Sequence, residues 1–173
     1  MMTKSNLDMI WDHIRILNGI AVRCVANLPA DKLDAHPIPR MRTPKELVVH
    51  MYTSSMRSMM EGLLSGNYQE YDEKSACERI QTKDDLLRFC DESWKASDRA
   101  ERAATDAHLA GEVKTPWGHA MPGPMCVQVV RDELLHHRGQ LYAYLRALGQ
   151  EVPDMYDYAN NAPEFRRREP AQA

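Results

Sequence analysis

Glu133 and His137, four residues apart, are the side chains of this sequence best placed to do chemistry together. On a helix that turns by about 100° per residue, both lie with Gln140 inside a stripe of apolar side chains. Burying such polar groups without partners would cost about 2 kcal/mol or more each, so something must satisfy them. The i, i+4 spacing allows two side chains to bind one metal ion. A hydrogen-bonded network in the core is the alternative for such a pair.

His50 is a further candidate ligand, on a different predicted helix that spans residues 44–65. It shares its side of that helix with Glu46, Ser54, Arg57 and Glu61, while apolar side chains occupy a wide arc elsewhere. A solvated polar face is the default interpretation of such a stripe. A helix so widely covered by apolar residues can also turn its polar stripe toward a wet internal cleft, where a metal site with open coordination would lie.

Four other residues are candidates for supporting roles around this pair. Gln140 and Tyr144 follow His137 by one and two turns on the same face and are placed to orient ligands. His136 points about 100° away from His137, so we interpret it as a supporting or inter-helix residue. Trp117 lies in the loop before the last predicted helix and could line the mouth of a site.

Four long helices must position these residues. Apolar residues recur at spacings of three and four, and segments rich in proline or glycine separate the helices. Residues 43–46 (TPKE) combine a capping threonine, a proline at the first helical position and a glutamate three residues after the cap. We predict helices over residues 5–28, 44–65, 83–106 and 125–148, and therefore an all-α four-helix bundle with loop-rich connections.

Composition narrows the class of protein further. The chain has 173 residues and a formal net charge of −3, which suits one domain and not a nucleic-acid binder. No stretch offers the roughly 18 apolar residues of a membrane-spanning helix, and the four cysteines form no C-x-x-C motif. We expect a cytoplasmic protein with one domain over residues 1–160 and a disordered tail over residues 161–173.

The segment that carries Glu133 and His137 resembles the last bundle helix of the DinB-like family. The resemblance rests on residues 131–149 (RDELLHHRGQLYAYLRALG), residues 152–156 (VPDMY) and residues 42–50 (RTPKELVVH). It implies a four-helix bundle, often dimeric, with a divalent ion bound by three histidines. His50 and His137 match two of them, whereas Glu133 stands where the third is usual. Two histidines and one carboxylate still suit zinc, iron, nickel or manganese.

The resemblance also implies a range of functions, because some members of the superfamily are thiol-dependent S-transferases. Our leading hypothesis is a metal-dependent transferase that uses a low-molecular-weight thiol and a small-molecule substrate, or a related hydrolase. The alternatives are a non-catalytic metal-binding protein of the stress response and a purely structural dimeric bundle. We expect a homodimer, from the resemblance and from Leu135 and Tyr142 on the outward side of the last helix.

Overall fold

Capping threonines begin three of the long helices. Thr3, Thr43 and Thr82 each accept a hydrogen bond from the backbone N–H three residues later, and the side chain of that later residue returns to the threonine N–H. The capping signal predicted at Thr43 is confirmed. Gly66 and Gly149, which directly follow the predicted helices 44–65 and 125–148, have φ values of 72° and 69°, in the left-handed region that glycine enters without steric cost.

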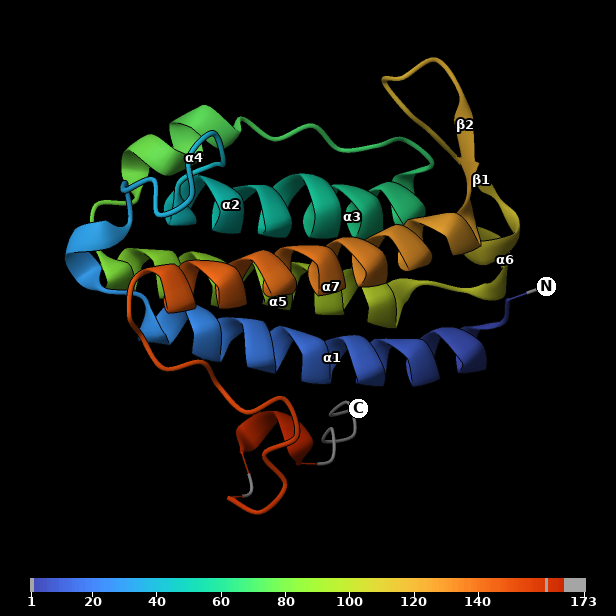
Figure 1. Ribbon diagram of the computed structural model, residues 1–173. Helices are drawn as coiled ribbons and strands as arrows, with labels where there is room; N and C mark the ends of the chain where they lie inside the picture. The colour runs from blue at the N-terminus through green and yellow to red at the C-terminus, as the bar shows by residue number, and fades with distance from the viewer. Residues whose placement is uncertain (1, 161, 167–173) are drawn as a thin grey trace.

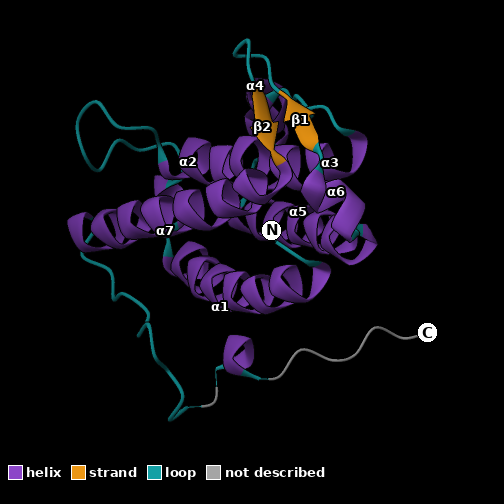
Figure 2. Ribbon diagram, turned by 90° about the vertical axis from the view of Figure 1, so that its right-hand side faces the viewer, coloured by secondary structure: helices purple, strands orange, loops and turns teal. Residues whose placement is uncertain are grey.

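The helices form a four-helix bundle, as the sequence predicts. The computed structural model describes residues 2–160 and 162–166. Its four rods are α1 (Lys4–Asn27), the composite rod of α2 (Pro44–His50), η2 (Met51–Arg57) and α3 (Ser58–Ser65), α5 (Lys83–Ala103), and α7 (Gly123–Ala147). The composite rod packs on α5 and α7 from the side opposite to α1 (Figure 2). His50 and His137 therefore lie on facing rods. No helix of the described residues is long and apolar enough to cross a membrane.

The direction of the rods forces a long crossover between α3 and α5. The composite rod and α5 run in the same direction, whereas α1 and α7 run in the opposite one (Figure 1). Residues 66–82 therefore return along the bundle and form α4 (Glu73–Arg79) beside α2. This crossover carries Glu73 to the polar stripe of the composite rod.

Several short elements were not predicted. They are α4, the one-turn helix η1 (Ala30–Lys32), α6 (Asp106–Ala110) and a two-stranded antiparallel hairpin of β1 (Glu112–Lys114) and β2 (Ala120–Pro122). The third long helix ends at Ala103 and not near residue 106, because Thr105 caps α6 by accepting a hydrogen bond from His108 N–H. Elements of this length are too short for a periodic pattern of apolar residues to be recognised in the sequence.

The segment after α7 folds back along α1 (Figure 1). Its one-turn helix η3 (Pro163–Phe165) carries Glu164, whose Oε1 lies 2.5 Å from Nη2 of Arg23. Gly19 makes this approach possible, because a Cβ there would lie 2.2 Å from Cβ of Glu164. Residues 161 and 167–173 of the predicted disordered tail lie outside the described residues, while residues 162–166 pack on α1. The domain boundary at residue 160 stays a prediction.

The outward side of α7 is covered by this same segment. Tyr142 donates a hydrogen bond from its hydroxyl to the carbonyl oxygen of Pro153 at 2.7 Å. Leu135 lines a groove together with Met155 and Tyr156. The two residues that suggested a surface for self-association therefore contact their own chain, and they no longer support a dimer.

Candidate metal centre

Helix α7 brings Glu133 and His137 into direct contact. Oε2 of Glu133 lies 3.0 Å from Nε2 of His137, as the i, i+4 spacing allows. The side chain of His137 is 6% exposed and that of Glu133 is 39% exposed. The imidazole of this pair is therefore shielded from solvent, whereas the carboxylate is accessible to it.

Gln140 determines which ring nitrogen of His137 carries the proton. Oε1 of Gln140 lies 2.7 Å from Nδ1 of His137. Because an amide oxygen can only accept, Nδ1 carries the proton and Nε2 presents a lone pair. Gln140, a supporting candidate from the sequence, thus directs Nε2 toward Glu133.

Nε2 of His137 faces Glu133 without a hydrogen bond between them. The 3.0 Å separation lacks hydrogen-bond geometry, and this buried nitrogen has no other partner among the described residues. Burial lowers the pKa of His137 below 6.5, against smaller opposing effects of Gln140 and Glu133, and so favours the neutral ring. A neutral Nε2 and a carboxylate oxygen both present lone pairs, and a cation between them would satisfy both.

His50 faces this pair from the last residue of α2. Its ring centroid lies 5.2 Å from that of His137, and the two ring planes meet at 82°. Ligand atoms of His50, Glu133 and His137 all lie within 4.8 Å of one another. These three residues, called the metal centre below, are a set of donors that can hold one metal ion, and their chemistry suits zinc, nickel, iron or manganese.

A π-helical turn directly after His50 shapes this side of the centre. In η2 the Ser58 N–H bonds to the carbonyl of Thr53, five residues earlier. Residues five apart therefore lie nearly above one another, whereas a regular helix would place Ser55 about 140° away from His50. Ser55 Oγ lies 3.5 Å from Oε2 of Glu133. A regular helix over residues 44–65, as predicted from the sequence, would not make this contact.

Glu73, the first residue of α4, contacts His50 and was also missed. Its Oε1 lies 2.9 Å from Nδ1 of His50 and 3.1 Å from Oγ1 of Thr53, and it accepts a hydrogen bond from Ser54. Burial opposes ionisation, but hydrogen bonds from these neighbours outweigh it and lower the pKa of Glu73 from 4.5 to about 2. The signal in the sequence was the i, i+4 pair of His50 and Ser54 on one helix face, which can both donate to one acceptor.

The remaining supporting candidates make other contacts. Tyr144 is buried and donates a hydrogen bond to the carbonyl oxygen of Arg42 at 2.6 Å, which ties α7 to the loop before α2. His136 is exposed, with its ring centroid 5.0 Å from that of His137. Trp117 is 55% exposed in the hairpin loop, where it packs against Tyr68. Figure 1 shows this hairpin at the opposite end of the composite rod from α4.

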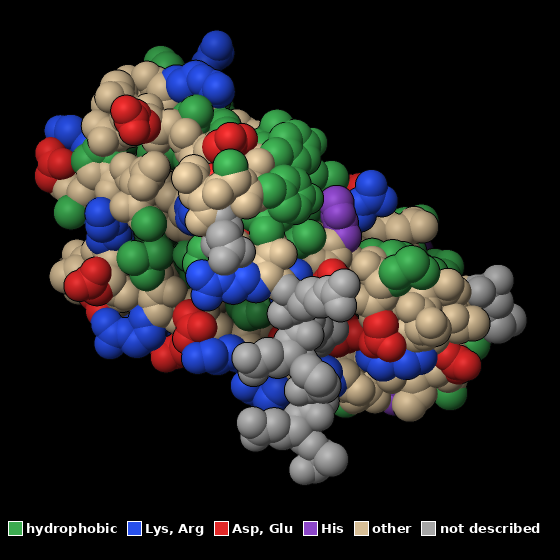
Figure 3. Space-filling view, turned by 90° about the horizontal axis from the view of Figure 1, so that it is seen from below, with side chains coloured by type: hydrophobic (Ala, Val, Ile, Leu, Met, Phe, Trp, Pro, Cys, Tyr) green, Lys and Arg blue, Asp and Glu red, His purple; other side chains and the backbone are tan. Residues whose placement is uncertain are grey.

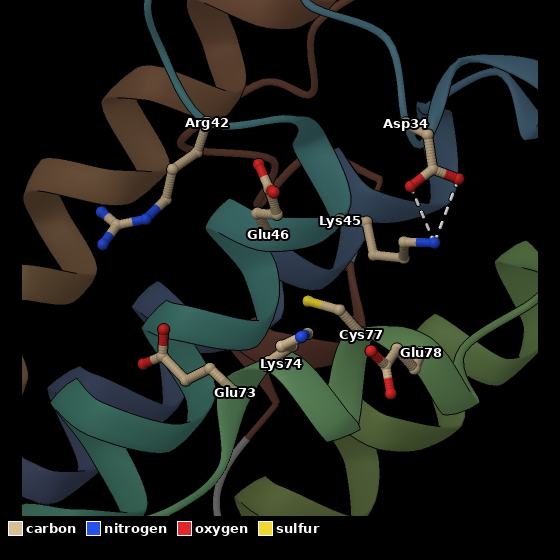
Figure 4. Close-up of a pocket in the computed structure, with 8 residues that line it drawn as sticks. All are labelled: Asp34, Arg42, Lys45, Glu46, Glu73, Lys74, Cys77 and Glu78. Atoms are coloured by element: carbon tan, nitrogen blue, oxygen red, sulfur yellow. Dashed lines mark hydrogen bonds and ion pairs between the residues drawn. The ribbon is translucent and has the colours of Figure 1, made fainter.

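Glu73, which contacts His50, also lines a cavity of about 510 Å³ (Figure 4). The cavity lies between α2, α4 and the loop before α2, and it is lined by Asp34, Arg42, Lys45, Glu46, Glu73, Lys74, Cys77 and Glu78. Only Cys77 among these residues is uncharged. The lining therefore combines four carboxylates and three cations, which suits a small molecule that carries charged groups.

A protein-family model described as the DinB family matches residues 1–170. The chain belongs to the DinB family. The resemblance of residues 131–149 to the last helix of that family is thereby confirmed. No curated protein matches the chain.

Solved structures of DinB-like proteins share the fold. A DinB-like protein from Bacillus subtilis is 21% identical, with a TM-score of 0.70 over 85% of this chain and 96% of its own. YfiT from Bacillus subtilis, described as a "probable metal-dependent hydrolase with an unusual four-helix bundle topology", is 18% identical, with a TM-score of 0.67 over 87% and 92%. A mycothiol-dependent maleylpyruvate isomerase is 16% identical, with a TM-score of 0.63 over 90% and 68%.

Proposed function

We propose that the metal centre binds one divalent ion (zinc, nickel, iron or manganese) and that the protein is a metal-dependent enzyme. The reaction we favour is transfer to or from a low-molecular-weight thiol, with a related hydrolysis as the second possibility. Two relatives in fold support these classes, since one is described as mycothiol-dependent and the other as a "probable metal-dependent hydrolase".

The observation that carries the proposal is the unsatisfied contact between His137 and Glu133. Two lone-pair atoms stand 3.0 Å apart, the nitrogen is buried without a hydrogen-bond partner among the described residues, and His50 approaches from the facing rod. A structural core network would instead place a hydrogen on that line. The geometry therefore favours a metal site over the purely structural bundle.

Each of the residues around the metal centre would have its own role when an ion is bound. A divalent ion held there would lower the pKa of a water molecule or thiol on its open side. Gln140 keeps the proton of His137 on Nδ1. Glu133, whose side chain is 39% exposed, opens the centre to solvent and to a substrate. The charged cavity beside Glu73 offers Arg42 and Lys74 to an anionic group of that substrate.

A non-catalytic metal-binding protein of the stress response is the alternative. Such a protein needs the metal centre but no substrate cavity. The cavity of about 510 Å³ is lined by Glu73 and by none of the three proposed ligands, so the choice between the two functions rests on activity measurements.

Elemental analysis of untagged protein, followed by activity screens, tests the proposal. We expect one equivalent of a divalent metal per chain. The metal-loaded protein should then consume a thiol with an electrophile, or hydrolyse an ester or amide, and His137→Ala should do neither. The thiols to be tested are glutathione, mycothiol and cysteine. A protein that binds metal but turns over none of these thiols, and hydrolyses no ester or amide, would favour the non-catalytic alternative. Absence of metal binding would contradict the whole proposal.

We further propose that the protein is a homodimer, through the side that α1 shares with the C-terminal segment. Figure 3 shows hydrophobic side chains gathered on this side. Met9 is 67% exposed, and Tyr156 and Tyr158 are 70% and 64% exposed. Clusters of exposed large apolar residues of this kind are typical of interaction surfaces. Light scattering should give twice the chain mass of 19.8 kDa, and Met9→Lys should return the protein to the monomer mass.

A further inference from the structure

The geometry points to Glu73 as a positioning residue that holds His50 ready to bind metal through Nε2. This inference rests on the proposed metal centre and goes beyond it. It assigns a role to a residue of the crossover that is not one of the three proposed ligands. Glu73 would act through His50 alone and would not touch the ion or the substrate.

The contacts of Oε1 fix the protonation of His50. This oxygen lies 2.9 Å from Nδ1 of His50. A carboxylate only accepts hydrogen bonds, so Nδ1 must carry a proton, and in the neutral ring that metal binding requires Nε2 then presents its lone pair. The ring then has the tautomer that a metal ligand needs, and its remaining nitrogen is free to face His137 and Glu133.

Ser54 holds Glu73 in this position, and Thr53 lies beside it. Ser54 donates a hydrogen bond to the same Oε1, and Oγ1 of Thr53 lies 3.1 Å from it. Both residues belong to η2, the turn that follows His50. The Thr53 hydroxyl also donates to the carbonyl oxygen of Val49, at the shorter distance of 2.7 Å. One carboxylate oxygen thus joins the crossover to the helix through hydrogen bonds from His50 and Ser54, with Thr53 packed beside it, so Glu73 loses little further freedom when it orients the imidazole.

The two histidines of the metal centre differ in their need for such a partner. His137 is 6% exposed, and a neutral amide suffices to orient it. The side chain of His50 is 22% exposed, so water reaches part of this ring. A carboxylate forms a stronger, charge-assisted hydrogen bond than an amide does. The more exposed histidine therefore has the stronger acceptor.

The test compares three variants of α4. Glu73→Ala removes the acceptor, Glu73→Gln keeps the side-chain size but is a poor metal ligand, and Glu78→Ala removes a carboxylate from the same helix and cavity without touching His50. For each we would measure the zinc affinity by competition titration and the His50 tautomer in the metal-free protein by ¹⁵N NMR.

We expect metal-free wild-type protein to carry the His50 proton on Nδ1. Glu73→Ala should lose this single tautomer and bind zinc about 10- to 100-fold more weakly. Glu73→Gln should keep stoichiometric binding with a smaller loss, and Glu78→Ala should match wild type. Circular dichroism would show that each variant is folded.

Several results would overturn the inference. A wild-type His50 with its proton on Nε2 would do so without any variant, and so would a Glu73→Ala protein that matches Glu78→Ala in zinc affinity. If Glu73→Gln lost binding as completely as His137→Ala, Glu73 would be a ligand and not a positioning residue. If wild type bound no zinc, the proposed function would fail, while the tautomer would still decide what Glu73 does to His50.

Discussion

Two clusters of buried polar groups lie on opposite sides of the bundle, and they are built differently. In the α1–α5 cluster (Lys4, Trp11, Asp98 and Glu101), Glu101 is fully buried and Lys4 Nζ lies 2.9 Å from its Oε1. Trp11 Nε1 donates a hydrogen bond to Asp98 at 2.9 Å. Each of these donors meets an acceptor within the chain.

The metal centre has the opposite arrangement. Its buried nitrogen faces another acceptor, and its carboxylate is open to solvent. Polar burial alone therefore does not mark a functional site, because the α1–α5 cluster has it too. What distinguishes the metal centre is that Nε2 of His137 is buried against an acceptor with no donor for it among the described residues, so the group that satisfies this nitrogen would come from outside the chain.

The largest expected effect is the loss of metal from His137→Ala. This substitution removes the only ligand of the centre that is nearly fully buried, so we expect stoichiometric zinc binding to disappear in a titration. The matched change in the other cluster is Trp11→Phe, which removes the hydrogen bond to Asp98 and should leave the zinc stoichiometry at one. Equal loss of zinc in both variants would mean that the two clusters do not differ as described.

The next effect is on folding and belongs to the α1–α5 cluster. Lys4→Met removes a cation that contacts the fully buried carboxylate of Glu101. We expect the free energy of unfolding to fall by about 2 kcal/mol in denaturant titrations, since a buried acceptor loses a partner. Zinc affinity should stay at the wild-type value. A change in affinity comparable to that of a ligand variant would contradict the separation of the two clusters.

A smaller effect is expected where one ligand type replaces another. Glu133→His restores the residue that the family resemblance implies at this position. Because imidazole and carboxylate both bind zinc at similar distances, we expect 1:1 binding to remain, with an affinity within about tenfold of wild type. Glu133→Ala is the control and should weaken binding much more. Similar affinities for Glu133→His and Glu133→Ala would show that residue 133 does not contact the ion.

The smallest effect is a dependence of stability on pH in the metal-free protein. The pKa of His137 lies below 6.5 in the folded chain, so the unfolded state binds more protons as the pH falls below that value. The contribution of the neutral His137 ring to the free energy of unfolding is therefore complete above pH 6.5. It decreases as the pH falls toward the pKa of His137 in the folded chain. Thermal unfolding between pH 7 and pH 5 should show a shallower decrease for His137→Gln than for wild type. An identical slope would contradict the neutral, buried state of this ring.

The sequence was sufficient for the long helices and for the pair on α7. A strong apolar period and clear caps fix such helices locally, and two residues at i, i+4 on one helix need no tertiary information to be placed together. The match of His50 to a ligand position came from family resemblance, because its own pattern favoured a solvated face.

Three features could not be predicted because they depend on the path of the chain. Glu73 reaches His50 only because α5 runs parallel to the composite rod, which forces residues 66–82 back along the bundle. Ser55 approaches Glu133 only because η2 is a π turn. Leu135 and Tyr142 are covered only because the C-terminal segment returns across the bundle. Helical periodicity contains no information on any of these.

Anomalous scattering from a crystal of the zinc-loaded protein tests the central claim most directly. We predict a single strong peak between α2 and α7, at about 2.0–2.3 Å from Nε2 of His50, Nε2 of His137 and an oxygen of Glu133. The same measurement on His137→Ala should show no peak at that position. A zinc peak elsewhere in the wild-type protein, or a hydrogen-bonded His137–Glu133 pair with no zinc beside it, would contradict the metal centre.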